Sequence, residues 1–386
     1  MRRLLPLLSA IAAIAAPSGA MAADVPLPPA RHVFVIVLEN HEFFDTFGPG
    51  GQAFAPYLNR TLVPMGQLLT QYYGVGHSSA DNYIAMIGGQ PPTPSGQNDC
   101  PDDPSNGAAD PYAGVHTPKR VPPDAQQPYN IAVGDGCLYP DNFPTIGDQL
   151  TAAGYTWKSY NQDMPSPCYK LGSYNAGHPG DYRRKHNPFV LYESLINSGQ
   201  CDANVVGLPS PEELATTLSS EATAPNFTYI VPNQCEDGHD TCAKPVPGAG
   251  LDPVSGSEVQ LSQIDSFLQR YVPPIVNSPV FQKDGLLVVT FDEAVENLSC
   301  CNEQPGPATD DPGNQAGIPG SGGGDSGAVL ISPFIKPGGF NTNGYNHYSL
   351  LRSVEDLFGL SHLGYAGMTG LAPFGADVFT NPPASP

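Results

Sequence analysis

Four short runs of apolar residues constrain the fold of this chain more than any other feature. They lie at 32–38, 227–231, 286–291 and 328–331, and each is apolar along almost its whole length. Continuous apolar runs of this length are typical of strands that are buried on both faces of a parallel sheet. The sequence therefore predicts a central sheet with helices covering both of its faces.

Segments with helical character separate the apolar runs. One helix start is clear, because Ser210 is followed by Pro211, Glu212 and Glu213, which supply an N-cap, a first-turn proline and an acidic first turn. This alternation of strands and helices indicates an α/β layered fold. The predicted helices lie at 145–153, 188–197, 211–219, 258–276 and 348–357.

Residues 1–22 have the features of a signal peptide. Arg2 and Arg3 precede an apolar stretch at 4–16, and the small residues at 20–22 suit a signal peptidase. The two arginines also permit the twin-arginine export route. We therefore expect a mature chain at 23–386 that is secreted or periplasmic. No later apolar run approaches the roughly 20 residues that span a bilayer, so we expect no stable membrane insertion.

The charge of the chain argues against one class of partner. The 386 residues include 16 Lys and Arg against 37 Asp and Glu, which gives a formal net charge of -21. A surface of this charge repels phosphate backbones and anionic membranes, so we expect no nucleic-acid partner. The sequence predicts no particular oligomeric state.

The chain has 8 cysteines. In an exported chain, an even number of cysteines indicates disulfide bonds. An oxidising compartment favours disulfides, and the absence of a CxxC pair argues against a zinc–thiolate site. The stretch at about 89–141 is dense in Pro, Gly, Asn and Asp and is predicted to be an insertion pinned by a disulfide, either a lid or a surface loop without a role. The pairs expected from proximity are Cys100–Cys137, Cys168–Cys201 and Cys235–Cys242, which leaves Cys300 and Cys301 to form a vicinal bridge or to find separate partners.

Polar residues follow three of the four apolar runs. Ligands bind at the carboxyl ends of the strands in open parallel sheets, and charged residues there are costly unless they are solvated or bound to a cation. The sequence therefore predicts a metal site at this edge of the sheet. The residues concerned are Glu39 and Asn40, Asp237 and His239, and Asp292 and Glu293.

Two helix starts complete the candidate site. Ser79 opens a helix-compatible segment, where a serine is either an N-cap or a nucleophile that a metal ion deprotonates. Free N–H groups at a helix N-terminus favour phosphate oxygens, which suits the second interpretation. His347 opens the last predicted helix, and beside the other sites it becomes a candidate metal ligand rather than a cap.

Six motifs resemble those of the phosphoesterase family that holds secreted acid phosphatases and phospholipases C. The run ENHEFFDTFG at 39–48 is similar to the family signature ENxSFDxxFG, and HSSADNY at 77–83 is similar to HPSLPNY of the acid-phosphatase branch. The resemblance extends from about His32 to Gly367. The other blocks, in family order, are KHNPF at 185–189, DGHD at 237–240, TFDE at 290–293 and NHYSLLR at 346–352.

The resemblance implies an alkaline-phosphatase-like three-layer sandwich, with a mostly parallel central sheet, long disulfide-pinned loops and a single domain at 23–386. It implies one or two divalent metal ions, with Ca, Mg, Mn or Zn all open. Where the family has proline, this chain has Ser78, so the nucleophile could shift by one residue. The implied roles are Ser79 as nucleophile, Asn40 and His77 at the substrate phosphate, Glu39, Ser79, Asp292 and Glu293 at one metal position, and Asp237, His239 and His347 at a second metal position or at the substrate.

The function that follows is that of a secreted metal-dependent phosphoesterase acting on a small phosphate ester. We expect an acid phosphatase that hydrolyses monoesters through a phosphoseryl intermediate. The alternative is a phospholipase C, whose relatives carry extra C-terminal β domains. A binding protein on an inactive scaffold is disfavoured, because every implied ligand is retained. The basic cluster at 183–185 is interpreted as a solvated face, with a phosphate-binding patch as the alternative.

Overall fold

The computed structural model describes residues 27–100, 119–120, 129–134, 136–174, 182–240, 256–304 and 322–381. The predicted signal peptide lies outside the described residues, as does much of the predicted insertion. Its interpretation as a lid or as a loop without a role therefore stays a prediction.

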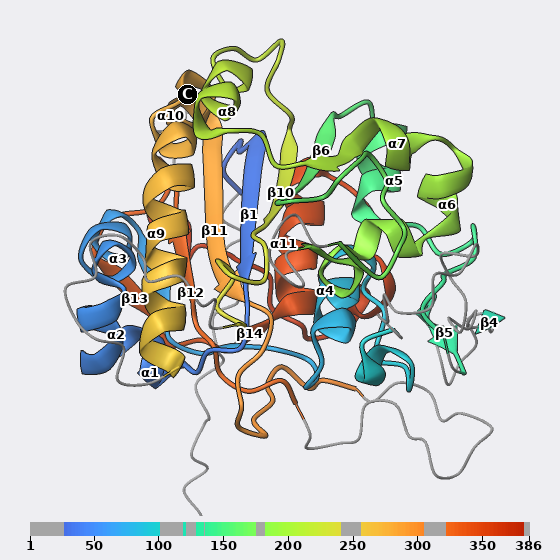
Figure 1. Cartoon of the computed structure of the whole chain (residues 1–386), viewed down its shortest axis with the longest axis horizontal. Helices are drawn as coiled ribbons and strands as arrows, with labels where there is room; N and C mark the ends of the chain where they lie inside the picture. Colours follow the sequence, from blue (N-terminus) through green and yellow to red (C-terminus); the bar gives the residue numbers. More distant parts are fainter. Residues whose placement is uncertain are drawn as a thin grey trace, which may run out of the picture.

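An eight-stranded sheet forms the centre of the protein, in the order β13-β2-β12-β11-β1-β10-β6-β9 (Figure 1). Every pairing is parallel except the two made by β12, which runs antiparallel to both β11 and β2. The strands in sheet order are Gly339–Asn341, Gln67–Leu69, Ala328–Ile331, Gly285–Phe291, His32–Leu38, Phe227–Val231, Trp157–Asn161 and Val205–Gly207.

The four predicted strands are confirmed as β1, β10, β11 and β12, four neighbours in the sheet. The outer strands were not predicted from the sequence, because three of them have only three residues and β6 has the polar sequence WKSYN. β12 starts at the edge of the sheet where β11 ends. It therefore runs back along β11, with Ala328 paired to Thr290 and Ile331 paired to Leu287, and this pair is antiparallel.

Helices cover both faces of the sheet (Figure 1). Alternate side chains of β1 enter two different cores, with Val35 in one and Ile36 in the other. The first core contains residues of α4 (Ser79–Gly88), α5 (Ile146–Ala152) and α11 (His347–Phe358). The second contains residues of α8 (Pro211–Thr217), α9 (Gly256–Val276) and α10 (Pro279–Asp284). The predicted three-layer sandwich is confirmed.

Shorter elements connect these layers. The helix predicted at 188–197 divides into a 3-10 helix, Pro188–Leu191, and α6, Glu193–Asn197. The other short helices are α1 (Phe43–Phe47), α2 (Pro49–Phe54), α3 (Val63–Met65) and α7 (Gln200–Asn204), with single turns or short runs at Leu58–Leu62, Gly96–Asn98, Arg184–His186 and Gly364–Gly367. Three two-stranded ribbons pair β3 (Tyr72–Tyr73) with β14 (Tyr345–Asn346), β4 (Lys119–Arg120) with β5 (Ala132–Val133), and β7 (Ser173–Tyr174) with β8 (Tyr182–Arg183).

The disulfides follow proximity along the chain. Cys100–Cys137 and Cys168–Cys201 are present as predicted, and Cys300 pairs with its neighbour Cys301. Cys235 is also disulfide-bonded. Its expected partner, Cys242, lies outside the described residues.

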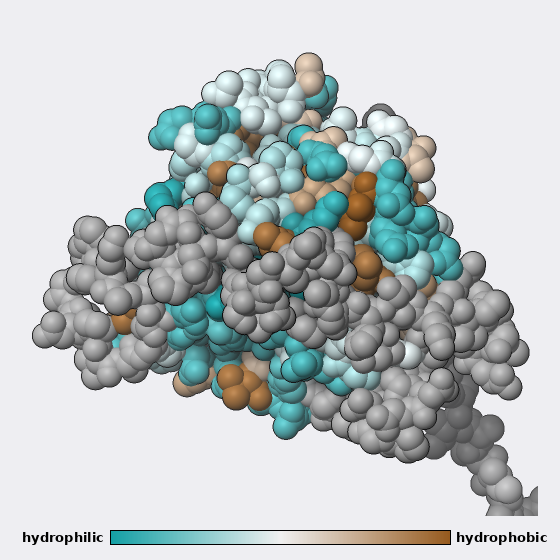
Figure 2. Space-filling model, turned by 45° about the vertical axis from the view of Figure 1, so that its right-hand side comes forward, coloured by the Kyte–Doolittle hydropathy of each residue, from teal (hydrophilic) through white to brown (hydrophobic). Residues whose placement is uncertain are grey.

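The described part of one face of the protein is mostly hydrophilic. Figure 2 shows teal and white residues over most of the described part of this face, with brown residues in small patches. Large apolar side chains that remain exposed include Phe44, Val295 and Phe340. Among the described residues, no helix combines the length and the apolar character needed to cross a membrane.

Glu355 is a fully buried carboxyl group on α11, away from the edge of the sheet where β1 and β11 end. One of its oxygens accepts a hydrogen bond of 2.8 Å from the Leu363 N–H, and the other has no hydrogen-bond partner. Burial raises the pKa of Glu355 to about 9, although the Leu363 N–H lowers it. The folded chain therefore favours the protonated form of this side chain.

Replacing Glu355 with Gln should make the protein more stable at alkaline pH. Because the pKa is raised on folding, the protonated carboxyl stabilises the fold at low pH, and this stability is lost as the pH rises toward the folded pKa. Thermal unfolding of Glu355→Gln should match wild type at about pH 4 and exceed it at about pH 8.5. The exposed Glu212→Gln serves as control, and equal effects of the two substitutions at alkaline pH would contradict the assignment.

Candidate functional site

Three buried carboxylates lie at the carboxyl ends of the neighbouring strands β10, β1 and β11. Glu39 and Asp292 directly follow β1 and β11, and Asp237 lies in the loop after β10; all three are 0% exposed. The Glu39 N–H donates to the Asp237 carbonyl at 2.8 Å, and the Asp292 N–H donates to the Leu38 carbonyl at 2.8 Å. The backbone therefore holds the three residues together.

Two unusual backbone conformations bring these side chains into the site. Asn40 has a φ of 51° and donates its N–H to Asp292 Oδ1 at 3.0 Å. Gly238 has a φ of 104°, and a Cβ there would lie 2.5 Å from Ile264 Cδ1 and 3.1 Å from the Glu39 carbonyl. Glycine fits this turn because its φ is in the left-handed region and because any other side chain would displace Ile264.

Ser79 is the first residue of α4, and its hydroxyl faces the carboxylates. Ser79 Oγ donates to Glu39 Oε2 at 2.9 Å in a buried position. The hydroxyl of the preceding Ser78 instead donates to the Gln97 carbonyl at 2.8 Å. Of these two neighbouring serines, only Ser79 makes a hydrogen bond to one of the three carboxylates.

His186 lies between Glu39 and Asp237, although neither the sequence pattern nor the resemblance predicts a role for it. Its Nε2 is 3.3 Å from Glu39 Oε1, and its Nδ1 is 3.5 Å from Asp237 Oδ2. The ring stacks on Tyr83 of α4 at 5.3 Å between centroids. The signal for His186 in the sequence is the KHNPF motif at 185–189, for which the resemblance implies no function.

Several polar atoms in this group are buried without a hydrogen-bond partner in the structure. They are Glu39 Oε1, His186 Nε2, Asp237 Oδ2 and Asp292 Oδ2. One ligand atom each from Glu39, His186 and Asp237 lies within 4.8 Å of the others. Buried polar groups are normally satisfied, and a shared divalent cation would satisfy these. The set of carboxylate oxygens and imidazole nitrogen fits such an ion and leaves its identity open.

The pKa shifts of these residues also favour a bound cation. Burial raises the pKa of Glu39 well above its usual value, and the charges of Asp292 and Asp237 raise it further. Burial also raises the pKa values of Asp237 and Asp292. Burial lowers the pKa of His186 well below its usual value, which favours the neutral ring that binds metals. A bound cation would restore the charged form of these carboxylates.

The other predicted residues lie around this group at different positions. Glu293 Oε2 accepts a hydrogen bond from Asn82 Nδ2 at 3.3 Å, and burial raises the pKa of Glu293 to about 10. The His239 ring lies 6.3 Å from the His186 ring, and its Nδ1 is 2.9 Å from Asp240 Oδ1.

His77 and His347 do not join the carboxylate group in the same way. His77 is exposed, two residues before Ser79. The Nε2 of His347 is 2.5 Å from the Asp292 carbonyl, and its Nδ1 is 3.1 Å from the Tyr72 hydroxyl. Both ring nitrogens of His347 therefore have protein partners, and its role as a ligand stays a prediction, as does the role of His77 at the phosphate.

The interpretation of the basic cluster at 183–185 as a solvated face was wrong for two of its three residues. Arg184 is 3% exposed and donates to the carbonyls of Lys170 and Cys100 at 3.0 and 3.1 Å. Lys185 is 9% exposed and forms an ion pair with Asp99. Local composition indicated positive charge there, but burial depended on segments distant in the sequence.

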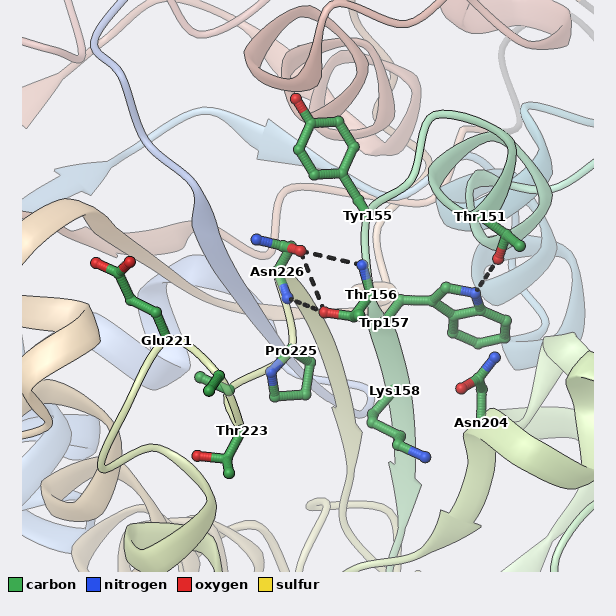
Figure 3. A pocket seen from close by; sticks show the side chains of 12 residues that line it. Thr151, Tyr155, Thr156, Trp157, Lys158, Asn204, Glu221, Thr223, Pro225 and Asn226 are labelled. Carbon is green, nitrogen blue, oxygen red and sulfur yellow. Dashed lines mark hydrogen bonds between the residues drawn. The ribbon is translucent and has the colours of Figure 1, made fainter.

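A pocket of about 460 Å³ lies at the opposite edge of the sheet, where β6 and β10 begin (Figure 3). Some of its polar groups bond to one another: Thr156 N–H donates to Asn226 Oδ1 at 3.0 Å, and Trp157 Nε1 donates to Thr151 Oγ1 at 3.0 Å. Because the pocket lies where these strands begin, it is at the opposite end of the strands from Ser79 and the three carboxylates.

Comparison with known proteins identifies the fold. The crystal structure of a protein in the alkaline phosphatase superfamily from Vibrio parahaemolyticus has a TM-score of 0.50 and 14% sequence identity, and the match covers 92% of this chain and 72% of that chain. This likeness shows that the three-layer sandwich is an alkaline-phosphatase-like fold.

Sequence comparison identifies the family. A probable acid phosphatase from Kluyveromyces lactis is 24% identical over 339 residues, which cover 86% of this chain but only 59% of that protein. A phosphatidylinositol-3-phosphatase from Mycobacterium tuberculosis is 25% identical over 352 residues, which cover 91% of this chain and 84% of that protein. The profile of the Phosphoesterase family matches residues 52–361, most of the chain. The chain therefore belongs to the phosphoesterase family.

Proposed function

We propose that this protein is an exported, metal-dependent phosphatase that hydrolyses phosphate monoesters with Ser79 as the nucleophile. The observation that carries the proposal is the hydrogen bond of 2.9 Å from Ser79 Oγ to Glu39 Oε2, beside the buried group of Asp237, Asp292 and His186. A nucleophilic hydroxyl next to a group that can accept its proton is the arrangement that covalent catalysis needs.

The reaction follows from the placement of these residues. Glu39 Oε2 accepts the proton of Ser79 as Oγ attacks phosphorus, the bond from phosphorus to the ester oxygen breaks, and a phosphoseryl intermediate forms. The departing ester oxygen takes a proton from a water molecule. The N–H groups at the start of α4 and the helix dipole stabilise the phosphate oxygens. The hydroxide left by that water then attacks phosphorus and breaks the Oγ–P bond, phosphate is released, and Glu39 returns its proton to Ser79 Oγ. A divalent cation held by Glu39, Asp237, Asp292 and His186 would keep the carboxylates ionised and withdraw charge from the phosphate.

The names of the relatives support a monoester substrate over the phosphodiester of a phospholipase C. The K. lactis relative is named an acid phosphatase, and the M. tuberculosis relative is named a phosphatidylinositol-3-phosphatase. Both names describe the removal of a terminal phosphate. The disulfides support a place outside the reducing cytosol, which agrees with the predicted signal peptide.

The second relative makes a phosphoinositide the second candidate substrate. It is matched over 84% of its length, compared with 59% for the K. lactis protein. Parallel assays on a chromogenic monoester, on phosphatidylinositol 3-phosphate and on phosphatidylcholine would separate a general phosphatase, a lipid phosphatase and a phospholipase C. Release of phosphocholine from phosphatidylcholine, with no phosphate released from either monoester, would contradict the proposal.

Replacing Ser79 with Ala should abolish turnover of a chromogenic phosphate monoester, because the attacking oxygen is lost. We expect kcat/KM to fall by about 10³-fold or more, as is usual when a covalent nucleophile is removed. The matched control is Ser78→Ala, which removes the neighbouring hydroxyl that bonds to the Gln97 carbonyl. The assignment fails if Ser78→Ala is the inactive variant or if Ser79→Ala turns over substrate like wild type.

Removal of the metal should affect stability as well as activity. Dialysis against a strong chelator should stop turnover and lower the midpoint of thermal unfolding, because a cation that binds only the folded chain stabilises it. Adding Ca, Mg, Mn or Zn singly should show which ion restores both properties. A chelated protein with unchanged turnover and an unchanged midpoint would rule out a metal at Glu39, Asp237, Asp292 and His186.

A further inference from the structure

One carboxylate, that of Asp99, bridges two groups that could bind phosphate beside Ser79. Asp99 Oδ2 lies 3.0 Å from Lys185 Nζ, and Asp99 Oδ1 accepts a hydrogen bond of 3.3 Å from the Ala80 N–H. Ala80 directly follows Ser79 in the first turn of α4. Asp99 thus forms an ion pair with Lys185 and accepts a hydrogen bond from a helix N-terminal N–H at the same time.

The surrounding segment holds Asp99 in this position. Its φ is 55°, in the left-handed region, and the Cys100 N–H donates to the Ser95 carbonyl at 2.8 Å. The Cys100–Cys137 disulfide anchors the end of the segment, and Arg184 Nη2 donates to the Cys100 carbonyl at 3.1 Å. The side chain of Asp99 is 34% exposed and that of Lys185 is 10% exposed, so Asp99 lies on the solvent side of the lysine.

Lys185 brings positive charge to a region rich in carboxylates. Burial lowers its pKa, but the negative charges of Glu39, Asp99 and Asp292 outweigh this effect and raise it. The side chain of Lys185 is 10% exposed, and Asp99 joins its ammonium group to the first turn of α4. An ammonium group and a helix N-terminal N–H are also the donors that bind phosphate oxygens in many proteins.

We propose that Asp99 is an internal competitor of the substrate: its carboxylate occupies the phosphate-binding position formed by Lys185 and the Ala80 N–H, and a phosphate group displaces it. The proposal rests on the proposed function, since it concerns the phosphate that Ser79 attacks. A monoester carries two negative charges near neutral pH, whereas a diester carries one. The dianion competes better with Asp99 for Lys185, so Asp99 selects monoesters over diesters.

The proposal predicts that removal of the Asp99 charge strengthens phosphate binding. Equilibrium dialysis of radiolabelled inorganic phosphate against the metal-loaded protein measures this without turnover. Asp99→Asn should lower the Kd of phosphate by about three- to tenfold, because phosphate no longer has to displace a carboxylate from Lys185 and the Ala80 N–H. Asp99→Ser, which removes the carboxylate in another way, should change Kd in the same direction and keeps the test open if Asp99→Asn folds poorly.

Two further variants isolate the mechanism. Asp356 lies on α11, its exposure is similar to that of Asp99, and its carboxylate is 2.7 Å from His362 Nε2. Asp356→Asn should leave the Kd of phosphate unchanged. Lys185→Gln should weaken phosphate binding, and in that background Asp99→Asn should give little further gain. In ester assays, Asp99→Asn should raise the ratio of diester to monoester kcat/KM.

The results that overturn the proposal differ from those that overturn the function. Weaker or unchanged phosphate binding by both Asp99 variants would show that Asp99 positions Lys185 or has no role at the phosphate. A full gain from Asp99→Asn in the Lys185→Gln background would also overturn it. A wild-type protein that binds phosphate with the predicted pattern but hydrolyses no ester would refute the proposed function and leave the competition at Lys185 intact.

Discussion

The arrangement of this protein depends on three carboxylates, Glu39, Asp237 and Asp292, buried side by side at one edge of the sheet. Their mutual repulsion and loss of hydration make this arrangement unfavourable for the folded chain by itself. The chain brings them together through backbone hydrogen bonds between β1 and the residues that follow β10 and β11. The burial of these carboxylates lowers the stability of the folded chain, and it creates a site that strongly favours a bound cation, as is common at functional sites.

The order of the strands explains why this edge holds the site. β10, β1 and β11 are parallel neighbours, so their carboxyl ends deliver three loops to one place. α4 packs on one face of the sheet and starts at this edge, which places Ser79 within hydrogen-bonding distance of Glu39. The antiparallel β12 returns the chain toward the other edge and contributes no further loop from its carboxyl end to this group.

A net charge of -21 is unexpected for a protein whose proposed substrate is an anion. Charge close to the reacting atoms matters more than the total, because solvent and salt screen distant surface charges. Lys185, the start of α4 and a bound cation would supply positive charge where Ser79 lies. Asp99 then has a physical meaning, since one negative group over Lys185 can tune which anions bind.

The sequence by itself determined the four central strands, most of the long helices, the α/β class and most of the residues around Ser79. These features are readable because continuous apolar runs, helix caps and strand-end carboxylates are local patterns. Only the tertiary structure decided the place of His186 between Glu39 and Asp237, the burial of Lys185 under Asp99, the direction of β12, and which of Ser78 and Ser79 faces a carboxylate. Each of these depends on contacts between segments far apart in the chain, and local patterns do not specify which distant side chains meet.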